Sequence, residues 1–265
     1  MVTVGRVIFI GAGPGAADLI TVRGARRLAD AEVVLFDALT DPSLRDLAPH
    51  AQWVDVGKRG FSGLPGCDAN GQARINKLLV KHALDGHLVV RLKGGDPSVF
   101  GRLEEELEAL AAHGIPSEVV PGVTAAIAAA AATQRPLTRR GSGRSVSLST
   151  AMTQDGDLRA SRSADTEVFY MAGRQLGALA RRLLEEGWPD NTPVSVISRA
   201  GWPDQVHSEH TVANLAQGSV LHAGRPTVVT VGIGATPVAG VDAPQPFTQK
   251  GLGEAAQPSA ESPNP

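Results

Sequence analysis

The chain has a single cysteine, no long apolar run and little net charge. One cysteine among 265 residues excludes an internal disulfide or a multi-cysteine metal site, and fits a reducing cytoplasm. No 18-residue apolar run occurs and the N-terminus lacks a basic segment followed by an apolar one, so we expect neither membrane span nor signal peptide. A net charge of −2 argues against a nucleic-acid binder, which is usually basic. We therefore expect a cytoplasmic protein without a metal site.

What is present is a pattern of short apolar strands alternating with helices. With 42% apolar and 20% charged residues, the chain can bury a large core as one or two domains. In the N-terminal half we expect strands at residues 7–10, 33–36, 88–92 and 118–120, and helices at residues 19–29, 72–83 and 102–113. Such alternation is typical of βαβ units in a mostly parallel sheet.

A second set of segments follows in the C-terminal half. We expect strands at residues 145–149, 167–171, 194–197 and 227–231, and a helix at residues 175–186. The sequence thus predicts two α/β domains, residues 1–117 and 118–240. Residues 241–265 contain few large apolar side chains, so we expect a disordered tail.

The most informative segment is the run VVRLKGGDPSVFGR at residues 89–102. An apolar strand leads directly into Gly94, Gly95 and Asp96. Glycine permits close approach of a ligand to the backbone, and a carboxylate accepts hydrogen bonds from hydroxyl or amine groups. Because open α/β sheets bind ligands beyond the carboxyl ends of their strands, this loop is a candidate binding site. An ordinary strand-to-helix turn would use the same residue types.

This run resembles the signature of the tetrapyrrole (corrin/porphyrin) methyltransferases. Other segments are similar to that family in the same order, and the likeness extends over about residues 5–235. They are VIFIGAGPG (7–15), DLIT (18–21), VVLFDAL (33–39), VGKR (56–59), VVPGVTAA (119–126), PLT (136–138) and VFYM (168–171).

The resemblance implies a fold, a cofactor and a set of contacts. It implies two α/β domains with the active site in the trough between them, usually in a homodimer, and S-adenosylmethionine as methyl donor with S-adenosylhomocysteine as product. The implied cofactor contacts are Pro14, Gly94, Gly95, Asp96, Val99, Thr124, Ala125, Met171, Ala200 and, more weakly, Thr227. From the residues alone, loop rigidity or core packing would explain Pro14, Val99, Met171 and Ala200 equally well.

The resemblance also implies residues that handle the proton and the substrate. Asp37, at the end of an apolar strand, is the implied general base, although a turn cap would also explain it. Lys58 is the implied proton donor, although lysines are usually solvated surface groups. Arg59, Arg139 and Arg140 are candidates for binding substrate carboxylates, since guanidinium groups pair with them bidentately.

The activity implied is methylation of uroporphyrinogen III at C2 and C7 to give precorrin-2, a tetrapyrrole on the route to sirohaem or cobalamin. An alternative within the family is a methyltransferase acting on a later precorrin. Family members usually carry a histidine at the position of Arg139 and another within the stretch that is Ser149–Met152 here. The resemblance therefore implies less about the details of the substrate pocket.

An alternative of another class is an NAD(P)-dependent oxidoreductase. Residues 11–16, GAGPGA, match the pattern G-x-G-x-x-A after a strand, and Asp37 then lies where a ribose-binding acid is expected. Pro14 argues against this alternative because it removes an N–H group from the loop that would bind the pyrophosphate.

Overall fold

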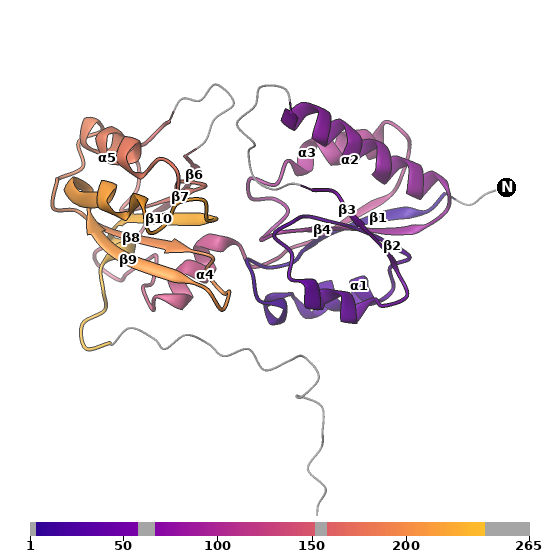
Figure 1. The fold of residues 1–265 in the computed structure, drawn as a ribbon, viewed down its shortest axis with the longest axis horizontal. Coiled ribbons are helices and arrows are strands. Elements are labelled where there is room, and N and C mark those ends of the chain that lie inside the picture. The colour runs from indigo at the N-terminus through magenta and orange to yellow at the C-terminus, as the bar shows by residue number, and fades with distance from the viewer. Residues whose placement is uncertain (1–3, 58–66, 152–157, 242–265) are drawn as a thin grey trace, which may run out of the picture.

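The computed structural model describes residues 4–57, 67–151 and 158–241. These residues form two five-stranded sheets, which lie side by side (Figure 1). The first belongs to the N-terminal half of the chain and the second to the C-terminal half. Helices cover both sheets, which confirms the predicted α/β class.

The first sheet is entirely parallel, with strand order β3-β2-β4-β1-β5. Parallel neighbours need crossover connections, which helices supply here. The strands are β1 (Arg6–Gly11), β2 (Val33–Phe36), β3 (Gln52–Asp55), β4 (Leu88–Lys93) and β5 (Ser117–Val120). The connecting helices are α1 (Val22–Ala29), the 3-10 helix η2 (Pro42–Leu47), α2 (Cys67–Leu84) and α3 (Leu103–Ala111).

Helices cover both faces of this sheet, α1 on one side and α2 with α3 on the other (Figure 1). Side chains alternate along β1 accordingly. Ile8 and Ile10 pack in the same core as Leu28 of α1, whereas Val7 and Phe9 pack in the same core as Leu79 of α2. A parallel sheet buried on both faces needs apolar side chains on both, which explains the near-continuous apolar runs in the sequence.

The second sheet is mixed, with order β6-β7-β10-β8-β9. Only β6 and β7 pair in parallel, and the other neighbours are antiparallel, an arrangement that the strand pattern does not predict. Its strands are β6 (Val146–Thr150), β7 (Thr166–Tyr170), β8 (Pro193–Ser198), β9 (Val206–Thr211) and β10 (Thr227–Gly232). One face is covered by α5 (Leu176–Glu185) and η3 (Val212–Ser219), while α4 (Ala125–Ala132) contacts β7 and β10.

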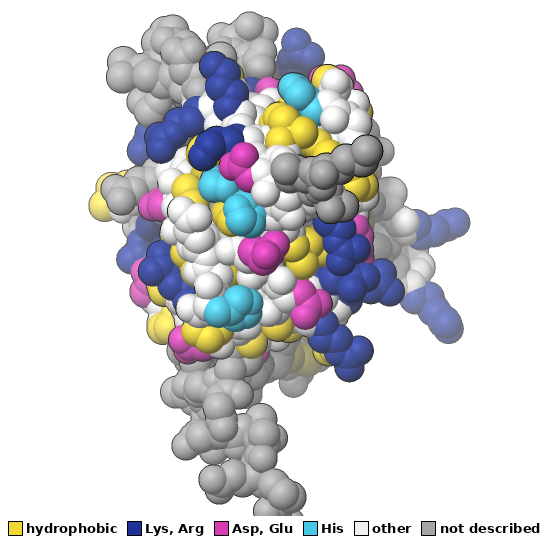
Figure 2. Space-filling view, turned by 90° about the vertical axis from the view of Figure 1, so that its right-hand side faces the viewer, with side chains coloured by type: hydrophobic (Ala, Val, Ile, Leu, Met, Phe, Trp, Pro, Cys, Tyr) yellow, Lys and Arg dark blue, Asp and Glu magenta, His cyan; other side chains and the backbone are white. Residues whose placement is uncertain are grey.

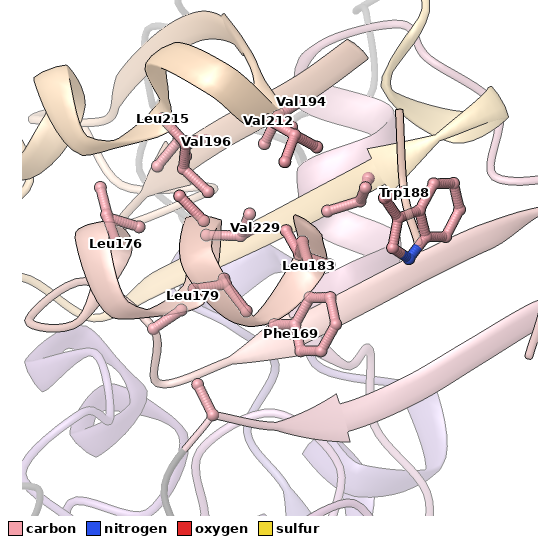
Figure 3. Close-up of a cluster of buried hydrophobic side chains, with 14 of the residues drawn as sticks. Phe169, Leu176, Leu179, Leu183, Trp188, Val194, Val196, Val212, Leu215 and Val229 are labelled. Carbon is pink, nitrogen blue, oxygen red and sulfur yellow. The ribbon is translucent and has the colours of Figure 1, made fainter. Parts of the chain in front are cut away.

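The core under α5 shows why this helix forms where the sequence predicts it. Leu176, Leu179, Ala180 and Leu183 are all buried, a spacing that places them on one face of a helix. They pack against Phe169 and the side chains of η3 (Figure 3). This core anchors β7 and β10.

Two edge strands and one α-helix are among the elements that the sequence pattern misses. The edge strands β3 and β9 are QWVD and VHSEHT, too polar to read as buried strands. Helix α4 is almost all alanine and therefore has no amphipathic period.

One predicted helix begins at a different position. The predicted helix 19–29 is a 3-10 turn at Ala17–Leu19 followed by α1, because the Thr21 hydroxyl accepts the Gly24 N–H at 3.0 Å and caps the helix at that point. The division between residues 117 and 118 stays a prediction. Pairing of β5 with β1 favours placing it after Val120. Residues 242–265 of the predicted disordered tail lie outside the described residues.

Candidate active site

Four loops come together at the carboxyl ends of the first sheet's strands. Segments 11–15, 37–40, 94–96 and 121–124 follow β1, β2, β4 and β5. Neighbouring strands β1 and β4 lead to helices on opposite faces, α1 and α3 (Figure 1). The connections after β1 and β4 therefore lead to opposite faces of the sheet. Open α/β sheets bind ligands at such a topological switch point.

Backbone contacts among glycines hold three of these loops together. Gly13 and Gly95 exchange hydrogen bonds, from Gly13 N–H at 3.2 Å and from Gly95 N–H at 2.7 Å. A Cβ on Gly122 would lie 2.3 Å from the Gly95 carbonyl oxygen and 2.7 Å from the Gly11 Cα. No side chain fits between these loops, so glycine is required here for packing.

Gly94 and Gly95 are different, because the space beside them is open. A Cβ on Gly94 would meet only the Leu39 Cβ at 3.4 Å, and a Cβ on Gly95 would have no neighbour closer than 3.9 Å. Gly95 also has a φ of 70°, which favours glycine. The outer side of this loop can thus accept a ligand against its backbone, and the loop fits the S-adenosyl cofactor that the resemblance implies.

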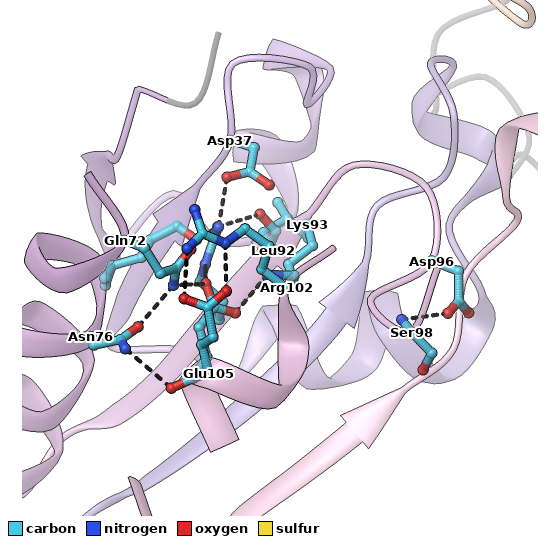
Figure 4. Close-up of polar contacts among 12 residues, drawn as sticks. Asp37, Gln72, Asn76, Leu92, Lys93, Asp96, Ser98, Arg102 and Glu105 are labelled. Atoms are coloured by element: carbon cyan, nitrogen blue, oxygen red, sulfur yellow. Dashed lines mark hydrogen bonds and ion pairs between the residues drawn. The ribbon is translucent and has the colours of Figure 1, made fainter. Parts of the chain in front are cut away.

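Asp96 ties the signature loop to the loop after β5. Its Oδ1 accepts the Ser98 N–H at 2.7 Å (Figure 4) and its Oδ2 accepts the Gly122 N–H at 2.8 Å. Both carboxylate oxygens therefore accept hydrogen bonds from backbone N–H groups, so the structure gives Asp96 a positioning role. Direct contact with a cofactor stays a prediction.

An apolar wall joins residues from both halves. Val99, Ala125 and Ala200 belong to one cluster, together with the buried Tyr170 and other residues of the second sheet. The Thr124 and Tyr170 hydroxyls are 2.7 Å apart, and burial raises the pKa of Tyr170. Three predicted contacts thus lie together, and Tyr170 is a site residue that the sequence analysis does not single out.

Met171, the next residue, has a φ of 59° and is 36% exposed. Left-handed backbone is uncommon for a residue with a long side chain and marks an unusual turn. The side chain is exposed, and its contact with a cofactor stays a prediction.

Trp202 is another residue that the sequence analysis misses. Its indole N–H donates to the Pro14 carbonyl at 3.0 Å, and a Cβ on Gly15 would lie 2.3 Å from the indole ring. The Arg199 guanidinium lies over the indole ring, 4.2 Å from the ring centroid. Trp202 follows Ala200 by two positions, which is the one signal in the sequence that could have drawn attention to it.

Thr227 is 3% exposed and its hydroxyl is already engaged. Oγ1 donates to the Arg225 carbonyl at 2.9 Å and lies 2.8 Å from the Ser198 hydroxyl. A Cβ on Gly173 would lie 2.5 Å from Thr227 Oγ1. Thr227 thus shapes the turn after Met171, and its contact with a cofactor stays a prediction.

A chain of hydrogen bonds that starts at Thr227 fixes which nitrogen of the buried His222 carries the proton. Because Thr227 donates to a carbonyl, it accepts from Ser198, which then accepts from His222 Nδ1–H at 2.6 Å. His222 Nε2 therefore accepts from the Ser208 hydroxyl at 2.8 Å. Burial lowers the pKa of His222 to about 4, so the imidazole is neutral at physiological pH.

The Asp37 side chain belongs to a largely buried network of charged groups (Figure 4). Its Oδ1 accepts from Arg91 Nη2 at 2.6 Å, and Arg91 Nε donates to Glu106 Oε1 at 3.1 Å. Glu106 Oε2 accepts from Lys93 Nζ at 2.5 Å. The Asp37 side chain is 15% exposed and the other three are at most 2% exposed. Desolvation, reinforced by the Arg91 charge, lowers the pKa of Lys93 to about 8.

The sequence analysis singles out Asp37 but not its partners. Arg91 and Lys93 alternate with Val90 and Leu92 on a buried strand, and two cations on an otherwise apolar strand are the signal that it overlooks. A buried cation needs a partner, and Glu106 of α3 supplies it.

The predicted substrate-binding arginines and the predicted proton donor Lys58 have different surroundings. Arg139 donates to the carbonyl oxygens of Thr236 and Pro237, which argues against a free guanidinium for substrate. Arg140 is exposed. Lys58 and Arg59 lie outside the described residues. The roles of all four stay predictions.

Acidic and basic side chains are interspersed on the end of the molecule formed by the first sheet (Figure 2). Within the described ranges, no group of three or more His, Cys, Asp or Glu side chains could hold a metal ion. The described helices include none long and apolar enough to cross a membrane.

The first loop lacks the features of a dinucleotide site. Ala12 N–H donates to the Lys93 carbonyl and Gly13 N–H to the Gly95 carbonyl, and Pro14 has no N–H. Helix α1 begins only at Val22, so its N-terminus does not open from the glycine loop as a pyrophosphate site requires. Asp37 is paired with Arg91.

Comparison with known proteins gives one family. The family model of the tetrapyrrole (corrin/porphyrin) methylases matches residues 6–216. A uroporphyrinogen-III C-methyltransferase of Pseudomonas aeruginosa is 42% identical over 233 residues, 86% of this chain and 93% of that protein. A siroheme synthase of Azotobacter vinelandii is 42% identical over 86% of this chain. The chain spans 50% of the length of that synthase.

Solved structures give the same result. The uroporphyrin-III C-methyltransferase of Thermus thermophilus complexed with S-adenosylhomocysteine aligns with a TM-score of 0.73 at 34% identity, over 87% of this chain and 98% of that one. A cobalt-precorrin-4 methyltransferase aligns with a TM-score of 0.75 at 27% identity, over 88% and 96% of the two chains.

Proposed function

Because the chain belongs to the tetrapyrrole (corrin/porphyrin) methylase family, we propose that it methylates uroporphyrinogen III at C2 and C7 with S-adenosylmethionine to give precorrin-2. The observation that carries this proposal is the open glycine loop at Gly94 and Gly95 beside the Asp37 loop, in a chain 42% identical to a uroporphyrinogen-III C-methyltransferase. A methyltransferase for a later precorrin is the alternative, supported by the likeness to the cobalt-precorrin-4 enzyme at 27% identity.

When bound, S-adenosylmethionine supplies an electrophilic methyl group on a sulfonium. The chain's part is to position that group and a pyrrole carbon in line. Gly94 and Gly95 offer open backbone for the cofactor, and Val99, Ala125 and Ala200 exclude water beside it. The remaining proposed contacts are Pro14, Asp96, Thr124, Met171 and Thr227.

Attack of the pyrrole carbon on the methyl group leaves a cationic ring that must lose a proton, and Asp37 is the proposed base. Its carboxylate is paired with Arg91 at Oδ1 and is partly exposed, so a substrate proton can reach it. Lys58 is the proposed proton donor. Arg59, Arg139 and Arg140 are the proposed partners of the substrate carboxylates, with the engaged guanidinium of Arg139 the weakest of the three.

We also propose that the protein acts in the cytoplasm as a homodimer. The single cysteine, which cannot form an internal disulfide, supports a reducing compartment. Exposed apolar side chains of Ile127 on α4 and Leu148 on the edge strand β6, at 54% and 41% exposure, support an interface on the second half. Sedimentation of the purified chain tests this: a monomer at micromolar concentration would contradict the dimer.

Calorimetric titration tests the cofactor class. S-adenosylhomocysteine should bind, whereas NAD and NADP should not. Gly94→Val provides the matched variant, because its side chain would enter open space and leave the fold intact. It should lose S-adenosylhomocysteine binding at an unchanged melting temperature. Unchanged affinity in the folded variant would contradict the loop assignment.

Transfer of labelled methyl to uroporphyrinogen III tests the substrate. Two methyl groups per tetrapyrrole are expected. Absence of transfer to uroporphyrinogen III, together with transfer to a later precorrin, would favour the alternative.

Asp37→Asn tests the base. Asn is nearly isosteric and cannot take a proton, so methyl transfer should fall by about 10²–10⁴-fold while S-adenosylhomocysteine affinity is kept. If Asp37 is only a turn cap, the loss should be small, since Asn caps almost as well.

A further inference from the structure

We propose that Glu106 is a positioning residue that holds the Asp37 carboxylate through Arg91. This inference rests on the proposed function, in which Asp37 removes the substrate proton. Glu106 lies on α3 and Asp37 follows β2, and among the described residues the Arg91 guanidinium donates to both carboxylates.

The Arg91 guanidinium is held at all three of its nitrogens. Nε donates to Glu106, Nη2 donates to Asp37, and Nη1 donates to the carbonyls of Leu35 at 3.3 Å and Leu92 at 3.1 Å. Rotation of the group would break several bonds at once. The position of Asp37 Oδ1 is therefore set by the orientation of Arg91. Among the described residues Oδ2 has no partner, so it is the oxygen available for a proton.

Glu106 is itself fixed from three directions. Arg91 and Lys93 reach it from β4, and the Gln72 amide of α2 donates to its Oε1 at 3.2 Å. With 0% of its side chain exposed, Glu106 cannot exchange these partners for water. A displacement of the Glu106 carboxylate would therefore also displace the Arg91 guanidinium.

Stability alone does not explain these residues. Replacing a buried ionic network by apolar side chains of similar size is often neutral or stabilising, and the neighbouring positions of β4, Val90 and Leu92, are already apolar. Two cations and two carboxylates, with only Asp37 reaching the surface, are what a site requires if one carboxylate must be held in one orientation.

The test is single-turnover methyl transfer by Glu106→Gln, measured both in the wild-type chain and in the Asp37→Asn background. If Glu106 acts through Asp37, the substitution should slow transfer by about tenfold or more in the first case and by less than about twofold in the second. S-adenosylhomocysteine affinity should stay within about twofold in both, because the described partners of the Glu106 side chain are Gln72, Arg91 and Lys93 and not the backbone of Gly94 or Gly95.

Two further variants keep the test interpretable. Lys93→Met with Glu106→Gln removes one cation with the anion, so it preserves charge balance and serves if the single variant does not fold. The same loss of transfer is expected. Glu185→Gln, which breaks an exposed Arg182–Glu185 pair on α5, is the control and should leave transfer unchanged.

Equal slowing in both backgrounds would overturn the inference, because Glu106 would then act without Asp37. Normal transfer by a folded Glu106→Gln chain would also overturn it. These outcomes leave the proposed function intact. Normal transfer by Asp37→Asn, in contrast, would remove the base from the proposed function and the inference with it, and absence of S-adenosylhomocysteine binding by the wild-type chain would refute the proposed cofactor itself.

Discussion

The indole N–H of Trp202 donates to the carbonyl oxygen of Pro14 at 3.0 Å, across 188 positions of sequence. This bond joins the first glycine loop to the second half of the chain beside Ala200. Because the proposed cofactor contacts come from both halves, the bond fixes their relative position where the cofactor would lie.

Trp202→Phe should therefore weaken S-adenosylhomocysteine binding. The variant keeps an aromatic ring against Gly15 but loses the donor, and one such bond is worth about 1 kcal/mol, or about a fivefold change in dissociation constant. Calorimetry measures it. Trp53→Phe is the control, because the Trp53 indole also donates to a carbonyl at 3.0 Å, that of Ala48, away from the loops. An equal effect of both variants would contradict the prediction.

Gly122→Ala should destabilise the fold rather than affect binding selectively. The new Cβ would lie 2.3 Å from the Gly95 oxygen and 2.7 Å from the Gly11 Cα. Both neighbours are backbone and cannot move aside, so we expect a loss of about 3 kcal/mol or more. Urea unfolding measures it, with Gly71→Ala in α2 as control. Gly71 has no neighbour within 4 Å of a new Cβ, and alanine there should stabilise by up to about 1 kcal/mol.

Lys93 should make stability rise with pH on the alkaline side. Its pKa is lowered from 10.5 to about 8 in the folded chain. Between these values the unfolded chain holds the proton and the folded chain does not, so the free energy of unfolding increases with pH in that window, on the order of 2–3 kcal/mol in total. Urea unfolding of wild type and Lys93→Met from pH 7.5 to 10 should show the steeper rise in wild type. Parallel curves would contradict the lowered pKa.

His222 should make stability fall on the acid side. Its pKa is lowered from 6.5 to about 4 on folding. As pH falls from 6.5 to 4, the unfolded chain takes up a proton that the folded chain does not, so the folded state loses stability through that window. His222→Gln should lose less stability between pH 7 and pH 5. The titration of His222 by NMR gives an independent check: a midpoint near 6.5 in the folded chain would be incompatible with the buried neutral imidazole.

Local patterns predict most of the first half and less of the second. The strands β1, β2 and β4 are recognisable as nearly continuous apolar runs, and helix α5 is recognisable because its buried side chains recur at helical spacing. Strand β9, sequence VHSEHT, is an edge strand whose pairing with β8 comes from backbone bonds rather than from apolar side chains. Its position could be found only once β8 was in place.

The site divides in the same way. The resemblance implies Gly94, Gly95 and Asp37 as site residues from short stretches of sequence, because loops that follow apolar strands are visible as local patterns. Trp202, Tyr170 and Glu106 were not found, since each acts through a partner far away in the chain. Nothing in the residues around Glu106 indicates that two cations of β4 will meet it.

By itself, the sequence of this protein determined its family, its α/β class and the glycine loops that end its strands, because these depend on residues close together along the chain. Only the tertiary structure decided which glycines are needed for packing and which leave open space, and that Arg91 joins Asp37 to Glu106. Those contacts depend on how the strands of the first sheet are ordered and on how the two halves meet. Burial then decides the charge state of Lys93 and His222, because desolvation acts on a group only after the chain has folded around it.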